Sequence, residues 1–208
     1  MRIYDCRNGT LSENDAEEIA DMIENGELIV YPSETVYGIG ANIFDEAAIK
    51  KLFIAKHRPF DMPLSVGVAD KEMACAIAEI DDNASKLIDA FMPGPLTIIV
   101  KKKDIVPDIV TSNSHKVGIR IPDHPVAQRI IRSTGPIVAT SANLHSKPDA
   151  VRMEEAKEQL GDTVSAYIDS GPCTLGEPST IIWLMGGEVE IIRQGAITKE
   201  QIEEVLRC

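Results

Sequence analysis

The chain alternates between two patterns of apolar residues, helical spacing and short continuous runs. Between Ala16 and Ile23 the apolar residues recur every three or four positions, which predicts a helix. Ser12 resembles the first residue of a capping box and Gly26 is a typical stop signal, so these two residues bound that helix. The run Leu28–Tyr31 is continuously apolar and ends at a proline, which is typical of a buried strand.

The same two patterns continue to the end of the chain. Further helices are predicted after Asp45, which is expected to cap the first turn, and over residues 84–91, 125–132, 153–160 and from 197 onwards. Strands are predicted over residues 64–68, 96–100, 117–121, 136–139, 166–168, 180–184 and 189–192. Helices that alternate with strands are typical of an α/β fold. We expect one twisted sheet, mixed or mostly parallel, with flanking helices in a single domain over residues 1–208.

Composition narrows the class of protein. Of the 208 residues 44% are hydrophobic but only 4% are aromatic, so the core is expected to be mainly aliphatic. The formal net charge of −12 disfavours a protein that binds nucleic acid over its whole surface, although a local cleft can still hold cations. The cysteines and histidines show no zinc-binding spacing, and the N-terminus has no apolar signal region. We therefore expect a reduced, cytoplasmic protein with no membrane span.

Polar clusters follow several of the predicted strands. YPSETVYGIG begins where the first strand ends, TSAN follows the strand at 136–139, and GIRIPDHP surrounds the strand at 117–121. Any one of these would be typical of an ordinary turn, because its residues are turn formers. Ligands gather at the carboxyl ends of strands in open α/β sheets, so several such clusters together predict one shared pocket.

Four cations fall beside these clusters. Lys56 and Arg58 lie near a predicted helix end, where positive charge complements the helix dipole, and Lys56 is expected at the surface. Arg120 interrupts an apolar strand and Arg193 closes another, and a charge in such a position needs a partner or a ligand. The four could clamp a triphosphate and a carboxylate. The sequence has no GxxxxGK[ST] loop and no recognisable triad, so spacing alone predicts an anion-binding pocket and no more.

Seven stretches, taken together and in order, resemble the threonylcarbamoyl-AMP synthases of the YrdC-like family. They are YPSETVYGIG (31–40), KHRPFDMPL (56–64), MPGPLTIIV (92–100), VGIRIPDHP (117–125), IVATSANLHSKPDA (137–150), GEPSTII (176–182) and IIRQGAI (191–197). Each is modest alone, but the ordered set covers nearly the whole chain and is specific. The resemblance implies a YrdC/RibB-like α/β fold in its single-domain form.

The resemblance also implies roles for individual residues. The nucleotide-binding KxR and SxN motifs of the family correspond here to Lys56, Arg58, Ser141 and Asn143, and Arg193 resembles a further ATP-contacting arginine. Lys56 and Arg58 would also serve catalysis. Because Lys56 is expected at the surface, its replacement by alanine is expected to weaken ATP binding and leave stability nearly unchanged.

A second group of residues is implied for threonine. It consists of the PTET-type loop, here Ser33, Glu34 and Thr35, with Tyr37 nearby, and of Arg120, Thr140 and Ser179. Arg120 would pair with the amino-acid carboxylate, and the hydroxyls would fix the rest of the substrate. Two departures from the family are that Ser33 begins the PTET-type loop and that Met62 stands where some members carry a histidine.

The implied reaction needs no side-chain nucleophile. The threonine amine takes up CO2 or bicarbonate as a carbamate, which attacks the ATP α-phosphate and releases pyrophosphate. The product is threonylcarbamoyl-AMP, the first intermediate of tRNA N6-threonylcarbamoyladenosine modification, which is handed to a tRNA threonylcarbamoyl-transferase complex. Mg2+ is expected to accompany ATP, and no metal-ligating residue is singled out. Catalysis would then rest on positioning and charge stabilisation.

Three other functions compete with this interpretation. An RNA-binding module for tRNA or double-stranded RNA is disfavoured by the acidic balance, although weak RNA binding is compatible with it. A carbamoyl-phosphate-using enzyme of the hydrogenase-maturation type would carry this module within a much larger chain. A regulatory subunit that binds nucleotide without turnover would show no threonine-dependent consumption of ATP.

Overall fold

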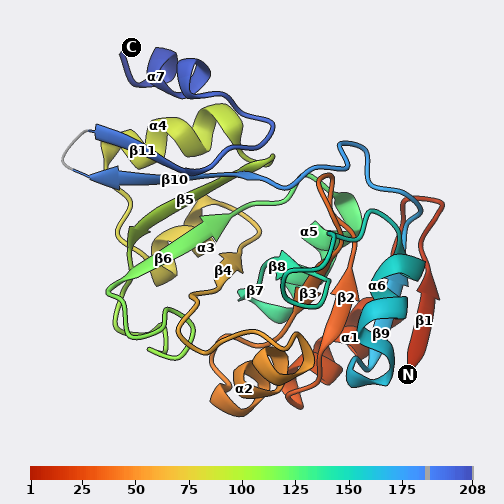
Figure 1. The fold of residues 1–208 in the computed structure, drawn as a ribbon. Helices are drawn as coiled ribbons and strands as arrows, with labels where there is room; N and C mark the ends of the chain where they lie inside the picture. Colours follow the sequence, from red (N-terminus) through yellow and green to blue (C-terminus); the bar gives the residue numbers. More distant parts are fainter. Residues whose placement is uncertain (186–187, 208) are drawn as a thin grey trace.

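The structure is a computed structural model that describes residues 1–185 and 188–207. Figure 1 shows two groups of strands, with helices on their outer sides. The helices are α1 (Glu13–Glu24), α2 (Glu46–Ala55), α3 (Lys71–Ile77), α4 (Asp82–Phe91), α5 (Pro125–Thr134), α6 (Met153–Leu160) and α7 (Lys199–Arg207). The strands are β1 (Arg2–Asp5), β2 (Ile29–Tyr31), β3 (Gly38–Gly40), β4 (Ser65–Gly67), β5 (Leu96–Lys101), β6 (Lys116–Arg120), β7 (Ile137–Val138), β8 (Thr140–Ser141), β9 (Ala166–Asp169), β10 (Thr180–Met185) and β11 (Glu188–Arg193).

The strands form two mixed sheets. One has the order β1-β9-β2-β3-β8 and the other the order β11-β10-β5-β6-β4-β7. Parallel pairs such as β5 with β10 occur beside antiparallel pairs such as β5 with β6. The α/β class with mixed pairing is therefore confirmed, but the strands divide between two sheets where the sequence pattern predicted one.

The chain passes from one sheet to the other at the end of the segment predicted as a single strand over residues 136–139. Val138 pairs with Val66 of β4 in the six-stranded sheet, whereas Thr140 pairs with Ile39 of β3 in the five-stranded sheet. The chain thus changes sheets across one residue, Ala139. Apolar patterning does not distinguish a strand that stays in its sheet from one that leaves it.

The predicted N-terminal caps of two helices, Ser12 and Asp45, are confirmed by their hydrogen bonds. The Ser12 hydroxyl accepts from the backbone N–H of Asp15, and the Asp45 carboxylate accepts from those of Ala47 and Ala48. The pattern did not predict β1, β3 or α3. In β3 the reason is steric, because a Cβ at Gly38 would lie 2.9 Å from the Tyr31 ring. Close packing against that ring selects glycine at a position where β propensity would not predict a strand.

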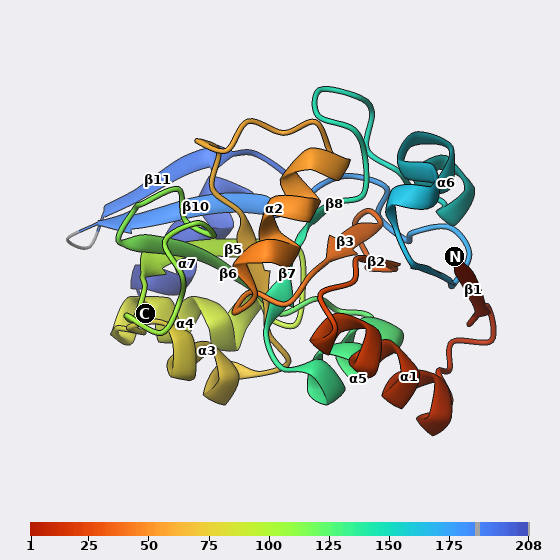
Figure 2. The same ribbon diagram turned by 90° about the horizontal axis from the view of Figure 1, so that it is seen from below.

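Four of the helices pack against one another in two pairs. Helices α1 and α5 pack against each other, and α4 packs against α7 and β5, as the view from below shows (Figure 2). The core is mainly aliphatic, as composition predicted, with Tyr37, Tyr167 and Phe53 as its largest fully buried aromatic side chains. None of the helices in the described part of the chain has the length and apolar character needed to cross a membrane.

Candidate functional site

A polar cavity of about 170 Å³ lies where the two sheets meet. Six of the residues singled out from the sequence line it: Arg58, Arg120, Thr140, Ser141, Ser179 and Arg193. They come from β6, from β8 across the junction, from the end of β11 and from loops next to α2 and β10. Ser65 and Thr97 also line the cavity, and sequence reasoning gave them no role.

Arg193 and Ser179 form one wall of this polar cavity. The Arg193 guanidinium donates to the Ser179 carbonyl from Nε at 3.0 Å and from Nη2 at 2.8 Å, and Nη2 also lies 3.1 Å from the Ser179 hydroxyl. That hydroxyl is in turn 2.9 Å from Thr97 Oγ1. Burial lowers the pKa of the Arg193 guanidinium. The wall therefore holds a cation and two hydroxyls in fixed geometry.

Arg58 also lines this cavity and lies just after the end of α2. Its Nη2 donates to the Pro63 carbonyl at 2.9 Å, which folds the side chain back over the turn that follows. Burial lowers the pKa of this guanidinium as well. Among the described residues, one hydrogen bond of good length holds Arg58, because Nε lies 3.4 Å from the Met62 carbonyl. Several of its N–H donors therefore remain for a ligand.

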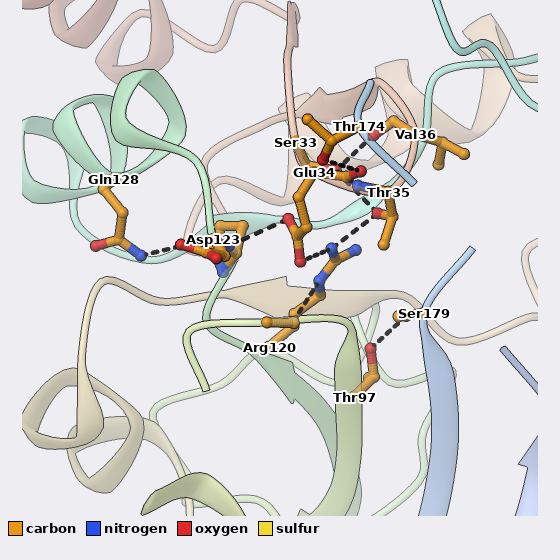
Figure 3. Close-up of polar contacts among 12 residues, drawn as sticks. Ser33, Glu34, Thr35, Val36, Thr97, Arg120, Asp123, Gln128, Thr174 and Ser179 are labelled. Carbon is orange, nitrogen blue, oxygen red and sulfur yellow. Dashed lines mark hydrogen bonds and ion pairs between the residues drawn. The ribbon is translucent and has the colours of Figure 1, made fainter. Parts of the chain in front are cut away.

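Arg120 projects from the end of β6 toward the loop that follows β2 (Figure 3). Its Nη2 lies 2.7 Å from Glu34 Oε1 and 2.8 Å from Thr35 Oγ1. Only 11% of the Arg120 side chain and 9% of the Glu34 side chain are exposed. The expectation that this charge needs a partner is confirmed, and the partner within the chain is Glu34.

Lys56 is not at the surface, so that prediction was wrong. The residue is 2% exposed, and its ammonium donates to the carbonyl of Ser141, to the carbonyl of Asn143 at 2.6 Å and to Asn143 Oδ1 at 3.2 Å. The helix ends at Ala55 with Lys56 as its C-cap residue, and the Lys56 side chain points inward to the TSAN turn instead of outward into solvent. Burial, with a smaller contribution from nearby Arg58, lowers the pKa of the ammonium to about 7.

The hydroxyls of the loop after β2 are used within the protein. Ser33 Oγ donates to the Val36 carbonyl at 2.6 Å and lies 2.9 Å from Thr35 Oγ1. The Tyr37 hydroxyl donates to the Gly171 carbonyl at 2.7 Å, and burial raises its pKa. Ser33 and Tyr37 line a narrow chamber of about 30 Å³ that adjoins the polar cavity.

A larger, mainly apolar cavity of about 450 Å³ adjoins the polar one. The two share Arg58 and Arg193, and the apolar cavity is walled by Trp183 and Met62 among others. Lys116 Nζ lies 3.4 Å from the centroid of the Trp183 ring, a cation–π arrangement. Sequence reasoning missed Lys116 and Trp183, although Trp183 is the chain's single tryptophan and could have been examined for that reason.

The donors around the two cavities suit anions better than metals. Within residues 1–185 and 188–207 there is no group of three or more His, Cys, Asp or Glu side chains that could hold a metal ion. The polar cavity instead gathers three arginines in a protein whose net charge is −12. Such a site can bind phosphate and carboxylate oxygens and hold two ligands next to each other.

Comparison with known proteins places this geometry in a family. The profile of the Sua5/YciO/YrdC family, described as "Telomere recombination", matches residues 21–195. A Methanocaldococcus jannaschii protein is 37% identical over 100% of this chain and 97% of its own length. The threonylcarbamoyl-AMP synthase of Bacillus subtilis is 39% identical over 94% of this chain, which spans 58% of that protein.

A solved structure agrees with these relatives. Pyrococcus abyssi Sua5 complexed with L-threonine superposes with a TM-score of 0.94 at 36% identity, over 99% of this chain and 61% of the Sua5 chain. The chain thus spans about three-fifths of the B. subtilis and P. abyssi proteins and nearly all of the M. jannaschii protein. On this agreement of sequence and fold, the chain belongs to the Sua5/YciO/YrdC family.

Proposed function

We propose that the protein is a threonylcarbamoyl-AMP synthase, which makes L-threonylcarbamoyl-AMP from L-threonine, ATP and bicarbonate or CO2 and releases pyrophosphate. The observation that carries this proposal is the pair of adjoining cavities, one polar and one apolar, that share Arg58 and Arg193. A nucleotide has the same division, with an apolar base at one end and phosphates at the other. The B. subtilis relative bears the synthase name, and the P. abyssi structure contains L-threonine.

ATP would lie across the junction of the two cavities. Arg58 and Arg193, which line both cavities, bind the phosphates, and the adenine ring enters the apolar cavity beside Trp183. Ser141 offers its hydroxyl from the polar side. Lys56 and Asn143 support this site without lining the cavity. The Lys56 ammonium donates to the backbone carbonyls of the turn that carries Ser141 and so holds that turn in place.

Threonine would lie in the polar cavity on the side of Arg120. Arg120 faces the amino-acid carboxylate, and the hydroxyls of Thr140 and Ser179 contact the rest of the substrate. Ser33, Thr35 and Tyr37 shape this side of the site through their internal hydrogen bonds. Their hydroxyls are already engaged, which favours a supporting role over direct contact.

The chemistry then takes two steps, an addition followed by a displacement. The threonine amine attacks the carbon of CO2, an N–H proton passes to solvent, and a carbamate results. A carbamate oxygen attacks the α-phosphorus of ATP, and the bond to the bridging oxygen breaks so that pyrophosphate leaves with the electron pair. The guanidinium groups bind both reactants and stabilise the phosphate charge as it moves to the leaving group.

Mg2+ would supply further neutralisation of the phosphates when it arrives with ATP. The cavity presents arginines and hydroxyls, which suit phosphate oxygens, so the ion would be held mainly by the nucleotide. We further propose that residues 1–208 act as one cytoplasmic synthase domain. Its product would be passed to a tRNA threonylcarbamoyl-transferase complex.

The direct test is pyrophosphate release. Protein, ATP, Mg2+, bicarbonate and L-threonine should release pyrophosphate and yield a product with the mass of threonylcarbamoyl-AMP. The rate should fall to background when threonine or bicarbonate is omitted. Release at the full rate without threonine would refute the proposal, and an Arg193→Ala variant that loses the activity while keeping its melting temperature would tie it to this cavity.

A further inference from the structure

Several of the N–H donors of Arg120 already have acceptors inside the protein. Its Nη2 faces both Glu34 Oε1 and Thr35 Oγ1, at 2.7 and 2.8 Å, which accounts for both N–H donors of that nitrogen. Its Nε lies 3.4 Å from the Gly94 carbonyl, too long for a strong bond. Among the described residues, Nη1 has no hydrogen-bond acceptor. The Nη1 edge is therefore what Arg120 can offer to a ligand in the polar cavity.

Glu34 fixes that orientation from two directions. While Oε1 meets the guanidinium, Oε2 accepts from the backbone N–H of Asp123 at 3.1 Å, just beyond the strand that carries Arg120. A carboxylate bonded through both oxygens cannot rotate freely about its last bond. The guanidinium plane is thus held by an acid that is itself held at both ends (Figure 3).

The backbone of Glu34 is fastened as well. Its carbonyl accepts from the backbone N–H of Leu175 at 2.8 Å and from Thr174 Oγ1 at 3.2 Å, both on the segment that crosses from β9 to β10. Glu34 belongs to the five-stranded side of the molecule and Arg120 to the six-stranded side. One residue therefore joins the loop after β2, the end of β6 and the crossing segment.

We infer that Glu34 is a positioning residue for the amino-acid substrate: it holds Arg120 so that only the Nη1 edge meets the threonine carboxylate. The inference rests on the proposed function, which places that carboxylate at Arg120. The pair also leaves little net charge at this point, so recognition depends on the direction of the Nη1 donors more than on an isolated positive charge. Glu34 does not line the cavity and would act through Arg120 alone.

The test uses Glu34→Gln, which keeps the size of the side chain and removes its charge. An amide has one oxygen, so it can accept from Arg120 or from the Asp123 N–H but not from both through oxygen. The Michaelis constant for threonine should rise about tenfold or more, because charge-assisted hydrogen bonds are the strong ones. The dissociation constant of ATP, measured by calorimetry, should stay within about twofold. Calorimetric titration with threonine gives a second readout that does not need turnover.

Two further variants make the result decisive. Glu79→Gln is the matched control, because it removes one carboxylate from the exposed Glu79–Lys101 ion pair, and it should change none of these constants. Glu34→Asp keeps the charge on a shorter side chain and should recover part of the threonine affinity. It also serves if Glu34→Gln does not fold.

The outcomes separate this inference from the proposed function. A wild-type protein that is active, with Glu34 variants whose threonine constants match it, overturns the inference alone. So does a variant that weakens ATP and threonine equally, or one that loses activity only in proportion to its folded fraction. A wild-type protein that neither binds threonine nor releases pyrophosphate overturns both.

Discussion

Lys56 is a buried ammonium surrounded by oxygen atoms. Its three N–H donors face the Ser141 carbonyl and two oxygens of Asn143, which matches the charged form. Burial acts in the other direction and lowers its pKa from 10.5 to about 7. No ion pair to Lys56 is found in the described part of the chain, although the negative charge of Asp149 acts against the fall in its pKa.

The stability of the protein should therefore depend on pH through this residue. Because the pKa is lower in the folded state, between about pH 7 and 10 the unfolded chain holds a proton that the folded chain has released. The free energy of unfolding should rise with pH across that window, and below it the full cost of burying the charge remains. Denaturant unfolding of wild type and of Lys56→Met at several pH values measures the difference. Parallel curves for the two proteins would contradict the prediction.

For individual residues, the sequence predicted which side chains belong to the site better than it predicted their contacts. Motif resemblance identified Arg58, Ser179 and Arg193, and all three line the polar cavity. Nothing in the sequence indicated that Lys56 turns inward or that Glu34 takes the Nη2 edge of Arg120. Both depend on contacts between segments about 85 residues apart, which periodicity does not report.

At the scale of the elements, the turn after β11 packs very closely against the segment that carries Ser179, which forms a wall of the polar cavity. A Cβ at Gly195 would lie 2.3 Å from the Pro178 carbonyl and 2.6 Å from the Thr180 nitrogen, both of them backbone atoms. Thr180 Oγ1 also accepts from the Gly195 N–H at 3.0 Å. The turn can thus approach Ser179 only because position 195 has no side chain.

Gly195→Ala should consequently displace Ser179 and its partner Arg193. Overpacking of this kind costs typically about 1–3 kcal/mol of stability, and the Michaelis constant for ATP should rise as the arginine moves. The control is Glu190→Ala, an exposed position on the same strand. Thermal melts and pyrophosphate kinetics measure the two effects, and wild-type values for Gly195→Ala would show that the turn can move without loss.

Helices and strands were predicted correctly where the pattern of apolar residues along the segment is strong. Helices with clear caps and periods, such as α1 and α5, were predicted from the sequence, and so were the continuous apolar strands. The strand β3 was not predicted, because its sequence GIG is typical of a turn. The helix α3 was not predicted although its residues favour a helix, because seven residues are too few for a clear period.

For the whole molecule, the main consequence of two sheets is that the polar cavity is built from both. Thr140 and Ser141 belong to the five-stranded sheet, and Arg120 and Arg193 end strands of the six-stranded one. A ligand that touches both sides binds the folded arrangement and not the unfolded chain. Binding should thus stabilise the protein as a unit.

A non-hydrolysable ATP analogue with threonine should raise the melting temperature. At ligand concentrations of about 100 times the dissociation constant the gain is about 2.7 kcal/mol. For a chain of this size each kcal/mol corresponds to roughly 2–4 °C. Differential scanning fluorimetry would measure the shift, with Arg193→Ala expected to show a smaller one. An unchanged melting temperature at saturating ligand would count against a site made by both sheets.

The single residue between β7 and β8 also couples the relative orientation of the two sheets to the position of the polar cavity. Two consecutive Cα atoms stand about 3.8 Å apart, so Ala139 leaves almost no slack between Val138 in one sheet and Thr140 in the other. Any tilt of one layer against the other must pull on the Thr140 and Ser141 hydroxyls directly. A spectroscopic label attached near this junction would read the tilt as a local signal. Lengthening the junction by one inserted glycine would uncouple that signal from the layers.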